Sequence, residues 1–160
     1  MYINVAGEIY DSLVNGPGMR YVIFFQGCTR KCKNCQNEHT WKIGAGIDMT
    51  TDEIRTNLEN SVFIDGITIS GGEPFLQENG LCDLCRKIKE KFPNYTIMIY
   101  TGYTIEDLKS LNNNYINETL KLVDYIAEGE YQCNNPTSKK YVGSNNQRVI
   151  NMKTGEEIFF

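Results

Sequence analysis

The sequence has no surplus of basic charge and no long hydrophobic run, and it contains a single histidine. Its 16 Lys and Arg residues are outnumbered by 20 Asp and Glu residues, which gives a net charge of −4. Nucleic-acid backbones are usually bound by clustered positive charge, so we expect no nucleic-acid partner. The apolar residues at the amino terminus are interrupted by Asn4, Glu8 and Asp11, which is typical of neither a signal peptide nor a membrane span. We therefore expect a cytoplasmic protein that has no membrane partner.

Internal repeats, low-complexity tracts and linkers are also absent from the sequence. A chain of 160 residues has the usual length of one domain. Its 41% hydrophobic content, with seven Phe and ten Tyr, is that of a globular protein able to bury a core. We therefore expect residues 1–160 to form a single domain.

Short apolar runs alternate with helical patterns along the chain. Strands are expected at 21–26, 66–69, 95–100 and 123–127, where β-branched and aromatic residues gather. Helices are expected at 51–60, 81–92 and 104–111, the first with Thr50 or Thr51 and Glu53 as a capping signal. This alternation indicates parallel βαβ units and an α/β fold. A full eight-stranded barrel needs at least about 200 residues, so the length favours a small incomplete (β/α) barrel or a short open sheet, with mostly parallel strands.

Six cysteines are present, and three of them lie close together directly after the first predicted strand. Cys28, Cys32 and Cys35 form a C-x3-C-x2-C array within residues 27–37, which we call the cysteine loop. A chain with a sufficient core and no secretory signal is poorly matched to a disulfide scaffold, so we expect the array to bind a metal. Three thiolates on one short loop can enclose an ion or cluster with little closure entropy.

The array is compatible with two kinds of metal site. His39 lies four residues after Cys35, so the three cysteines and His39 could form a closed Cys3His zinc site. A four-iron cluster could instead use only the three thiolates, which leaves one iron open for a substrate. Basic side chains in the loop favour thiolates and offset an anionic cluster, although a solvated loop explains them equally well. These basic residues are Arg30, Lys31 and Lys33.

A second motif follows the next predicted strand. Gly71, Gly72, Glu73 and Pro74 form a Gly-Gly-Glu-Pro turn. Paired glycines let a ligand approach the backbone closely, and unpaired amides in such a turn can bind a carboxylate. The Glu73 carboxylate or nearby carbonyl groups can bind an ammonium group. We therefore interpret the turn as a site for a bound amino acid.

Together, the cysteine array and the Gly-Gly-Glu-Pro turn resemble those of the radical S-adenosylmethionine superfamily. Within it, the chain resembles the family of proteins that activate anaerobic ribonucleoside-triphosphate reductase, a glycyl radical enzyme. The resemblance extends over nearly the whole length. It includes residues 14–20, the cysteine loop with Thr40 and Trp41, and residues 101–103 and 143–148.

The resemblance implies that Cys28, Cys32 and Cys35 hold one [4Fe-4S] cluster and that S-adenosyl-L-methionine binds to its open iron. It implies an oxidoreductase in which reductive cleavage of S-adenosylmethionine gives methionine and a 5′-deoxyadenosyl radical. That radical would abstract a Cα hydrogen from a glycine of the reductase catalytic subunit and leave a glycyl radical. Because the cofactors carry this chemistry, we assign no catalytic side chain. A low-potential electron donor such as a flavodoxin is a further expected partner.

The contacts with S-adenosylmethionine are expected from the two motifs. They are Asn34, Cys35, Gln36, Gly71, Gly72 and Glu73. Many members of the superfamily have an aromatic residue before the third cysteine, whereas this chain has Asn34, so we expect adenine packing to depend on backbone contacts. The residue after the third cysteine, often aromatic in the family, is Gln36.

Both motifs follow the carboxyl ends of predicted strands, as do Thr101-Gly102 and Glu128-Gly129. Parallel α/β folds place their sites at that edge, so we expect these segments to meet in one active site. An incomplete barrel would leave a lateral opening for the glycine segment of the partner, and residues 15–20 are expected to border it.

The remaining cysteines are expected to take no part in the metal site, and Cys133 is expected to be incidental. Cys82 and Cys85 lie one helical turn apart and should be buried as small hydrophobic residues, and Cys133 lies in a polar tail. Two alternatives to the activase remain open at this point. They are a radical enzyme that acts on a small molecule, such as a deazapurine precursor, and a noncatalytic Cys3His zinc-binding module.

Overall fold

The computed structural model describes all of residues 1–160. The strands are β1 (Tyr2–Ser12), β2 (Arg20–Phe25), β3 (Ile47–Thr50), β4 (Gly66–Gly71), β5 (Thr96–Tyr100), β6 (Tyr125–Glu128), β7 (Arg148–Asn151) and β8 (Glu156–Glu157). The α helices are α1 (Thr51–Glu59), α2 (Glu78–Lys91), α3 (Ile105–Ser110) and α4 (Asn114–Leu122), and the 3-10 helices are η1 (Glu38–Thr40) and η2 (Pro74–Gln77). None of these helices is both long and apolar enough to cross a membrane.

All eight strands form one open sheet in the order β3-β1-β2-β4-β5-β6-β7-β8. The four central strands, β2, β4, β5 and β6, are parallel to one another. At both edges the pairing is antiparallel, with β1 and β3 on one side and β7 and β8 on the other. The predicted α/β class is confirmed, and its parallel strands form the centre of the sheet that positions the site.

The four predicted strands and three predicted helices are all present, with ends shifted by a few residues. The capping signal is also confirmed, because the Thr50 hydroxyl accepts from the Glu53 amide while the Glu53 carboxylate accepts from the Thr50 amide. The sequence did not predict β1, β3, α4, β7 or β8. Helix α4 has a local start signal that we missed, because the Asn113 side chain accepts hydrogen bonds from the amides of Tyr115 and Ile116.

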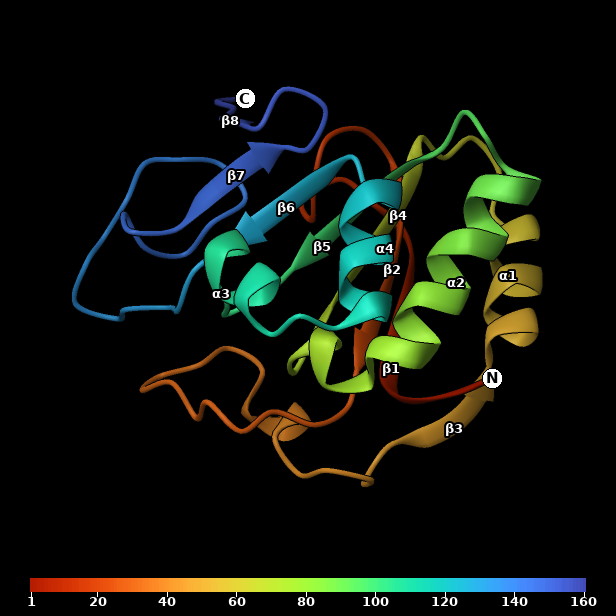
Figure 1. Cartoon of the computed structure of the whole chain (residues 1–160), viewed down its shortest axis with the longest axis horizontal. Coiled ribbons are helices and arrows are strands. Elements are labelled where there is room, and N and C mark those ends of the chain that lie inside the picture. Colours follow the sequence, from red (N-terminus) through yellow and green to blue (C-terminus); the bar gives the residue numbers. More distant parts are fainter.

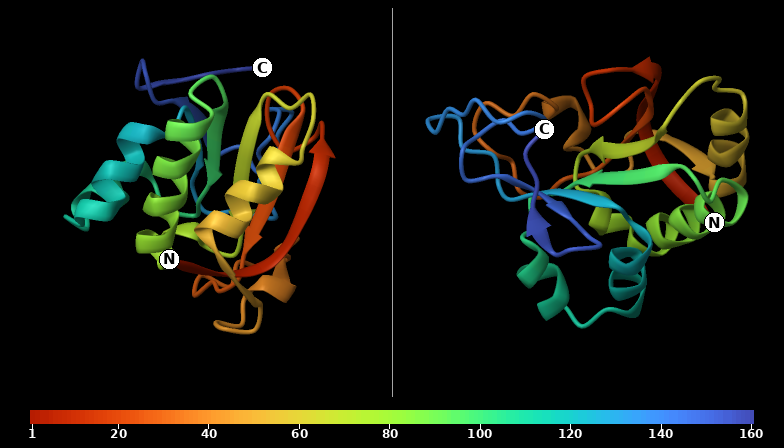
Figure 2. Two further views of the ribbon diagram at one scale, coloured as in Figure 1. Left: turned by 90° about the vertical axis from the view of Figure 1, so that its right-hand side faces the viewer. Right: turned by 90° about the horizontal axis from the view of Figure 1, so that it is seen from above.

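The two faces of the sheet are covered differently (Figures 1 and 2). All four α helices pack on one face, where their apolar side chains join those of the strands in a single core of 24 buried residues. Cys85 belongs to this core and Cys82 is also fully buried, as predicted. The opposite face has a much smaller apolar cluster around Met98, Ala127 and Val149. Alternate residues of a strand point to opposite faces, so the helix-free face is left available for a site.

A buried arginine fastens the turn before β2 to the helix-free face. Arg20 is fully buried and donates to the Thr68 hydroxyl (2.7 Å), the Ile67 carbonyl (2.6 Å) and both oxygens of Thr96 (2.9 Å each). It also donates to the Pro17 carbonyl at 2.9 Å. Burial lowers the pKa of Arg20 to about 10, so the side chain is still charged at neutral pH. No carboxylate forms an ion pair with it, and its buried charge is compensated mainly by these oxygen acceptors.

We expect Arg20→Met to lower the free energy of unfolding by about 3 kcal/mol or more. Methionine fills much of the volume, but it leaves several buried oxygens without a donor, at about 1–3 kcal/mol each. The matched control is Arg55→Met on α1, which removes half-exposed ion pairs of 3.8–3.9 Å and should cost less than about 1 kcal/mol. Urea unfolding at neutral pH measures both. Equal losses for the two variants would contradict the structural role given to Arg20.

Candidate functional site

A cavity of about 560 Å³ opens at the carboxyl ends of the parallel strands. Its wall contains all three cysteines of the array, together with Gly71, Gly72 and Glu73 after β4. Thr101 and Gly102 after β5 and Gly129 after β6 complete this part of the wall. The sequence-based prediction that these segments meet at one edge of the sheet is therefore confirmed. Asn15 also lines the cavity, so the turn that Arg20 fastens borders the site.

The cysteine loop is fastened at its base and curved by its own backbone. The amides of Gly27 and Cys28 donate to the carbonyls of Thr40 (2.6 Å) and Trp41 (3.1 Å), which holds the start of the loop against the segment that follows it. Lys31 and Asn34 have positive φ angles of 50° and 57°. Asparagine tolerates this left-handed conformation better than an aromatic residue does. The position before the third cysteine is thus used for a backbone turn.

The three thiols are half-buried and free, and each lines the same cavity. The amide of Asn37 donates to the Cys35 sulfur at 3.4 Å, which is the kind of backbone donor that tunes an iron–sulfur site. Burial and, to a smaller extent, the Glu130 carboxylate raise the pKa of the Cys32 thiol above its ordinary value. Metal ions bind the thiolate form of cysteine, so binding of a metal at Cys32 would displace a proton from this thiol.

The donor set fits a cluster better than a single ion. No three or more His, Cys, Asp or Glu side chains converge on a point that could hold one metal ion. His39 is exposed and does not line the cavity, so the geometry gives no support to a Cys3His zinc site. A four-iron cluster places each thiolate on a different iron, and its ligands need to surround a volume instead of a point. Three thiols on the wall of one cavity satisfy that requirement.

The two glycines of the second motif allow the ends of the adjacent parallel strands β2 and β4 to approach each other closely at the base of the site. Gly71 has a φ of +104°, and a side chain there would overlap the backbone of Phe25. A side chain at Gly72 would overlap the Gly27 carbonyl. The amides of Gly72 and Glu73 donate to the carbonyls of Phe25 and Gly27, both at 2.8 Å. The interpretation of these amides as unpaired carboxylate receptors is therefore wrong, because the chain's own backbone occupies them.

Glu73 is 2% exposed, and both of its carboxylate oxygens accept hydrogen bonds from donors of the chain. One oxygen accepts from the Phe75 amide (3.1 Å) and the Thr101 hydroxyl (2.8 Å), and the other accepts from the Gly102 amide (2.9 Å). Burial raises the pKa of Glu73, and these hydrogen bonds offset part of that rise. The carboxylate thus joins the ends of β4 and β5.

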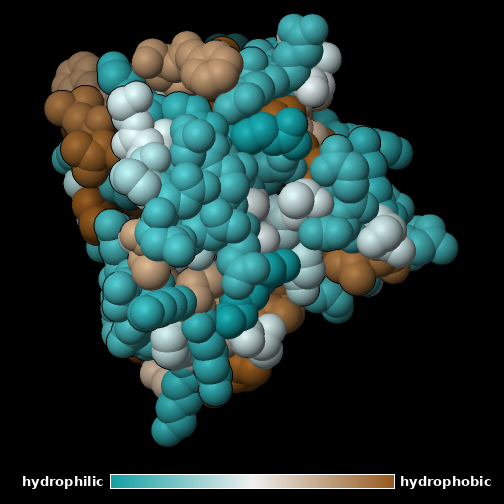
Figure 3. All heavy atoms as spheres, turned by 90° about the vertical axis from the view of Figure 1, so that its left-hand side faces the viewer, coloured by the Kyte–Doolittle hydropathy of each residue, from teal (hydrophilic) through white to brown (hydrophobic).

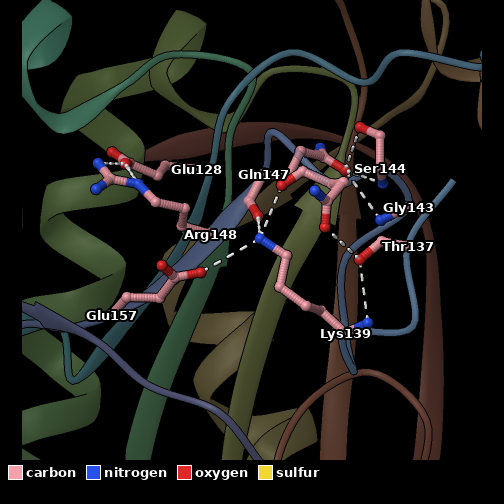
Figure 4. Close-up of polar contacts among 9 residues, drawn as sticks. Glu128, Thr137, Lys139, Gly143, Ser144, Gln147, Arg148 and Glu157 are labelled. Atoms are coloured by element: carbon pink, nitrogen blue, oxygen red, sulfur yellow. Dashed lines mark hydrogen bonds and ion pairs between the residues drawn. The ribbon is translucent and has the colours of Figure 1, made fainter. Parts of the chain in front are cut away.

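The other predicted contacts with S-adenosylmethionine divide into two groups. Cys35 and Gln36 line the cavity with the glycines and Glu73, whereas Asn34 is exposed and lies outside the wall. Glu128, expected at the same edge, is also directed elsewhere. Its carboxylate accepts from the Ile105 amide at the start of α3 and is paired with Arg148 (Figure 4).

Sequence reasoning missed the wall made by residues 129–147, which we call the tail loop. Gln147 lines the cavity, accepts from the amides of Gly143 and Ser144, and donates to the Gly129 carbonyl at 3.0 Å. Lys139 fixes the loop from the other side by donating to the carbonyls of Asn145 and Gln147 (Figure 4). Residues 143–148 were noted only as part of the family resemblance, because nothing local in them indicates these partners.

The protein surface around the site is mainly hydrophilic on the side where the tail loop and cysteine loop project, with hydrophobic residues toward its edges (Figures 1 and 3). Two of the exposed hydrophobic residues, Ile9 and Val14, line the cavity itself and are 44% and 79% exposed. The neighbouring Leu13 is 64% exposed. The site therefore has one apolar margin, formed by β1 and the turn that follows it.

Known proteins resemble the chain in sequence and in fold. The family model described as "4Fe-4S single cluster domain" matches residues 14–150. The anaerobic ribonucleoside-triphosphate reductase-activating protein of Enterobacteria phage T4 is 40% identical over 141 residues, which are 85% of this chain and 86% of that protein. The protein of the same name from Escherichia coli (strain K12) is 29% identical over 148 residues, or 88% of this chain and 94% of that protein.

Among solved structures, QueE from Escherichia coli matches with a TM-score of 0.54 and 19% sequence identity. The match covers 65% of this chain and 54% of QueE, so the likeness concerns the fold alone. The sequence matches are more extensive. On their strength, this chain belongs to the family of anaerobic ribonucleoside-triphosphate reductase-activating proteins and contains the 4Fe-4S single-cluster domain.

Proposed function

We propose that this chain activates an anaerobic ribonucleoside-triphosphate reductase by generating a glycyl radical on its catalytic subunit. The proposal includes a [4Fe-4S] cluster held by Cys28, Cys32 and Cys35, and S-adenosylmethionine as the cosubstrate. The observation that carries it is the meeting of the three thiols with the ends of four parallel strands in one cavity. Membership of the activating-protein family supports the identity of the partner.

When bound, the cluster and S-adenosylmethionine supply an electron and a 5′-deoxyadenosyl radical. The side chains and backbone of this chain hold these two groups in position. Cys28, Cys32 and Cys35 would hold the cluster, and the Asn37 amide, which donates to the Cys35 sulfur, would stabilise that ligand. Glu73 fixes Thr101 and Gly102 in the opposite wall. We propose an external low-potential donor such as a flavodoxin as the source of the electron.

The apolar margin suits the entry of a segment from the reductase. Ile9 and Val14 are exposed and reach the cavity, and Asn15 lies beside them in its wall. Exposed apolar residues that continue into a cavity are typical of interaction sites. A backbone segment that contains glycine is slim enough to enter such a space, because glycine has no side chain. Selectivity then depends on how closely the glycine Cα is placed to the reactive carbon.

Replacing Cys28, Cys32 or Cys35 singly by Ala should abolish the intact cluster and S-adenosylmethionine cleavage, since each thiolate binds a different iron. Iron and sulfide content after anaerobic reconstitution measures the first effect, and formation of 5′-deoxyadenosine measures the second. Cys133→Ala is the matched control, because Cys133 is free and exposed and should leave both unchanged. Cys82→Ala should also keep the cluster. Full turnover by any of the first three variants would contradict the ligand assignment.

Glu73→Gln should weaken S-adenosylmethionine binding and lower the free energy of unfolding by about 2 kcal/mol. An amide presents one oxygen and one NH2 group, so at least one buried donor now at a carboxylate oxygen would face another donor. Calorimetry of the reconstituted variant and urea unfolding measure the two effects. The control is Glu78→Gln, a change of the same kind a few residues away at the start of α2. If Glu73→Gln matched the control in both measurements, Glu73 would not organise the site.

Deuterium transfer tests the substrate and the reaction together. With a reductase labelled with α-deuterated glycine, deuterium should appear in 5′-deoxyadenosine, and a persistent glycyl doublet should appear on the reductase by electron paramagnetic resonance. Both signals should require a reduced cluster. Formation of unlabelled 5′-deoxyadenosine without a protein radical, under oxygen-free conditions, would exclude the activase and favour a small-molecule substrate.

A further inference from the structure

Arg30 lies in the cysteine loop between two of the proposed ligands, yet its position is determined by a different part of the chain. Its guanidinium carbon is 4.3 Å from the centre of the Tyr103 ring, directly after β5. Gly102 leaves room for the side chain, because a Cβ at that position would be 2.6 Å from the Arg30 Nε atom. The stem and guanidinium are therefore held against the end of β5, and Arg30 forms part of the cavity wall. This arrangement differs from a solvated basic side chain.

The carboxylate of Glu130 lies between the Arg30 guanidinium and the sulfur of Cys32, one of the proposed cluster ligands. Arg30 Nη1 is 3.9 Å from one carboxylate oxygen of Glu130, in the tail loop. The other oxygen of the same carboxylate is 3.7 Å from the Cys32 sulfur. The guanidinium and the sulfur are thus separated by a single carboxylate group. Once Cys32 is a thiolate in an anionic cluster, a cation at this position is favourable and the Glu130 carboxylate is unfavourable.

The Nε atom of Arg30 is a hydrogen-bond donor that has no acceptor in the chain. It is buried and has no hydrogen-bond partner within the chain. Buried donors without an acceptor are rare and unfavourable, and this one lies in the cavity wall, so it is available to an acceptor on a bound ligand. Thiolate and sulfide sulfurs of the cluster are acceptors of this kind, and hydrogen bonds to them are among the factors that set the potential of iron–sulfur centres.

We infer that Arg30 and Glu130 are positioning residues with opposite effects on the reduction of the cluster. The inference rests on the proposed function only in requiring that the cluster binds to the three cysteines. Reduction transfers one electron from an external donor to the oxidised cluster, with no bond formed or broken, and adds one negative charge beside Cys32. Arg30 stabilises that added charge and raises the reduction potential, whereas Glu130 lowers it. Contacts outside the iron ligands commonly tune metal centres in this way.

Other cations of the loop do not share this placement. Lys33 lies between Cys32 and Cys35 but is exposed, and it forms no ion pair within the chain. A charge in water is screened by solvent and salt far more than a half-buried one. Lys33 is therefore a control that removes the same charge from the same loop without removing the contacts of Arg30.

The test is a potentiometric titration of the reconstituted full-length chain, without S-adenosylmethionine or reductase, followed by electron paramagnetic resonance. Dithionite or titanium(III) citrate serves as the one-electron reductant. Arg30→Gln should lower the equilibrium constant for cluster reduction about tenfold, a shift of about 59 mV for a one-electron couple. Glu130→Gln should raise the potential by less than Arg30→Gln lowers it, because the Glu130 side chain is 54% exposed although one of its oxygens is 3.7 Å from the Cys32 sulfur. Lys33→Gln should change the equilibrium constant less than about threefold, because its charge is exposed.

Iron content and S-adenosylmethionine affinity separate the possible failures. Unchanged potentials for Arg30→Gln and Glu130→Gln, or shifts no larger than that of Lys33→Gln, would overturn the inference. So would an unchanged potential for Arg30→Gln accompanied by a loss of S-adenosylmethionine affinity, because the buried donor would then serve the cosubstrate. If Arg30→Gln cannot hold iron, Glu130→Gln tests the inference instead. A raised potential supports it, and an unchanged or lowered potential overturns it. Failure of the wild-type chain to assemble a cluster would instead contradict the proposed function itself.

Discussion

The close approach of the backbones at the ends of the neighbouring strands β2 and β4 is the constraint on which the site depends. The parallel register places Phe25 opposite Gly71, and the turn that follows brings the Gly72 and Glu73 amides onto the carbonyls of Phe25 and Gly27. Cys28 is the next residue after Gly27, so this close approach determines where the cysteine loop begins. Only glycine fits at 71 and 72, because a side chain at either position would overlap backbone atoms. The glycine pair thus places the three cysteines relative to the sheet.

Beyond the ends of β2 and β4, hydrogen bonds also connect the ends of the next strands in the sheet. Glu73 accepts from Thr101 and Gly102, which joins the end of β4 to that of β5. The Gly129 amide donates to the Tyr103 carbonyl at 3.0 Å, which joins the end of β5 to that of β6. Main-chain ends that are mutually fixed in this way provide a rigid wall. A rigid wall suits the proposed reaction, because small displacements of the reacting atoms reduce both rate and selectivity.

Different side-chain contacts hold the segments at the two ends of the helix-free face. At the amino ends of the strands, Arg20 uses its buried charge to hold the preceding turn against β4 and β5. At the carboxyl ends, Gln147 and Lys139 hold the tail loop beside the cavity. The antiparallel strands β7 and β8 continue the sheet beneath the tail loop. The cavity between these two ends is bounded by residues from nearly the whole length of the chain, and Arg30 in its wall is paired with Glu130 of the tail loop.

The sequence by itself determined the features encoded within a few neighbouring residues. The strand at Arg20–Phe25, the start of α1 at its Thr50 cap and the spacing of Cys28, Cys32 and Cys35 are of this kind, since local propensity and spacing express them directly. The carboxyl-end rule for parallel strands then brought both motifs to one edge. Only the tertiary structure decided which groups meet there, because those contacts join residues far apart in the chain. The strand β3 exists through its pairing with β1, the glycine amides bind carbonyls of β2 and the loop after it, and Arg30 is positioned by Tyr103 and Glu130. Such long-range contacts depend on the packing of the whole sheet, and no short segment carries the information that specifies them.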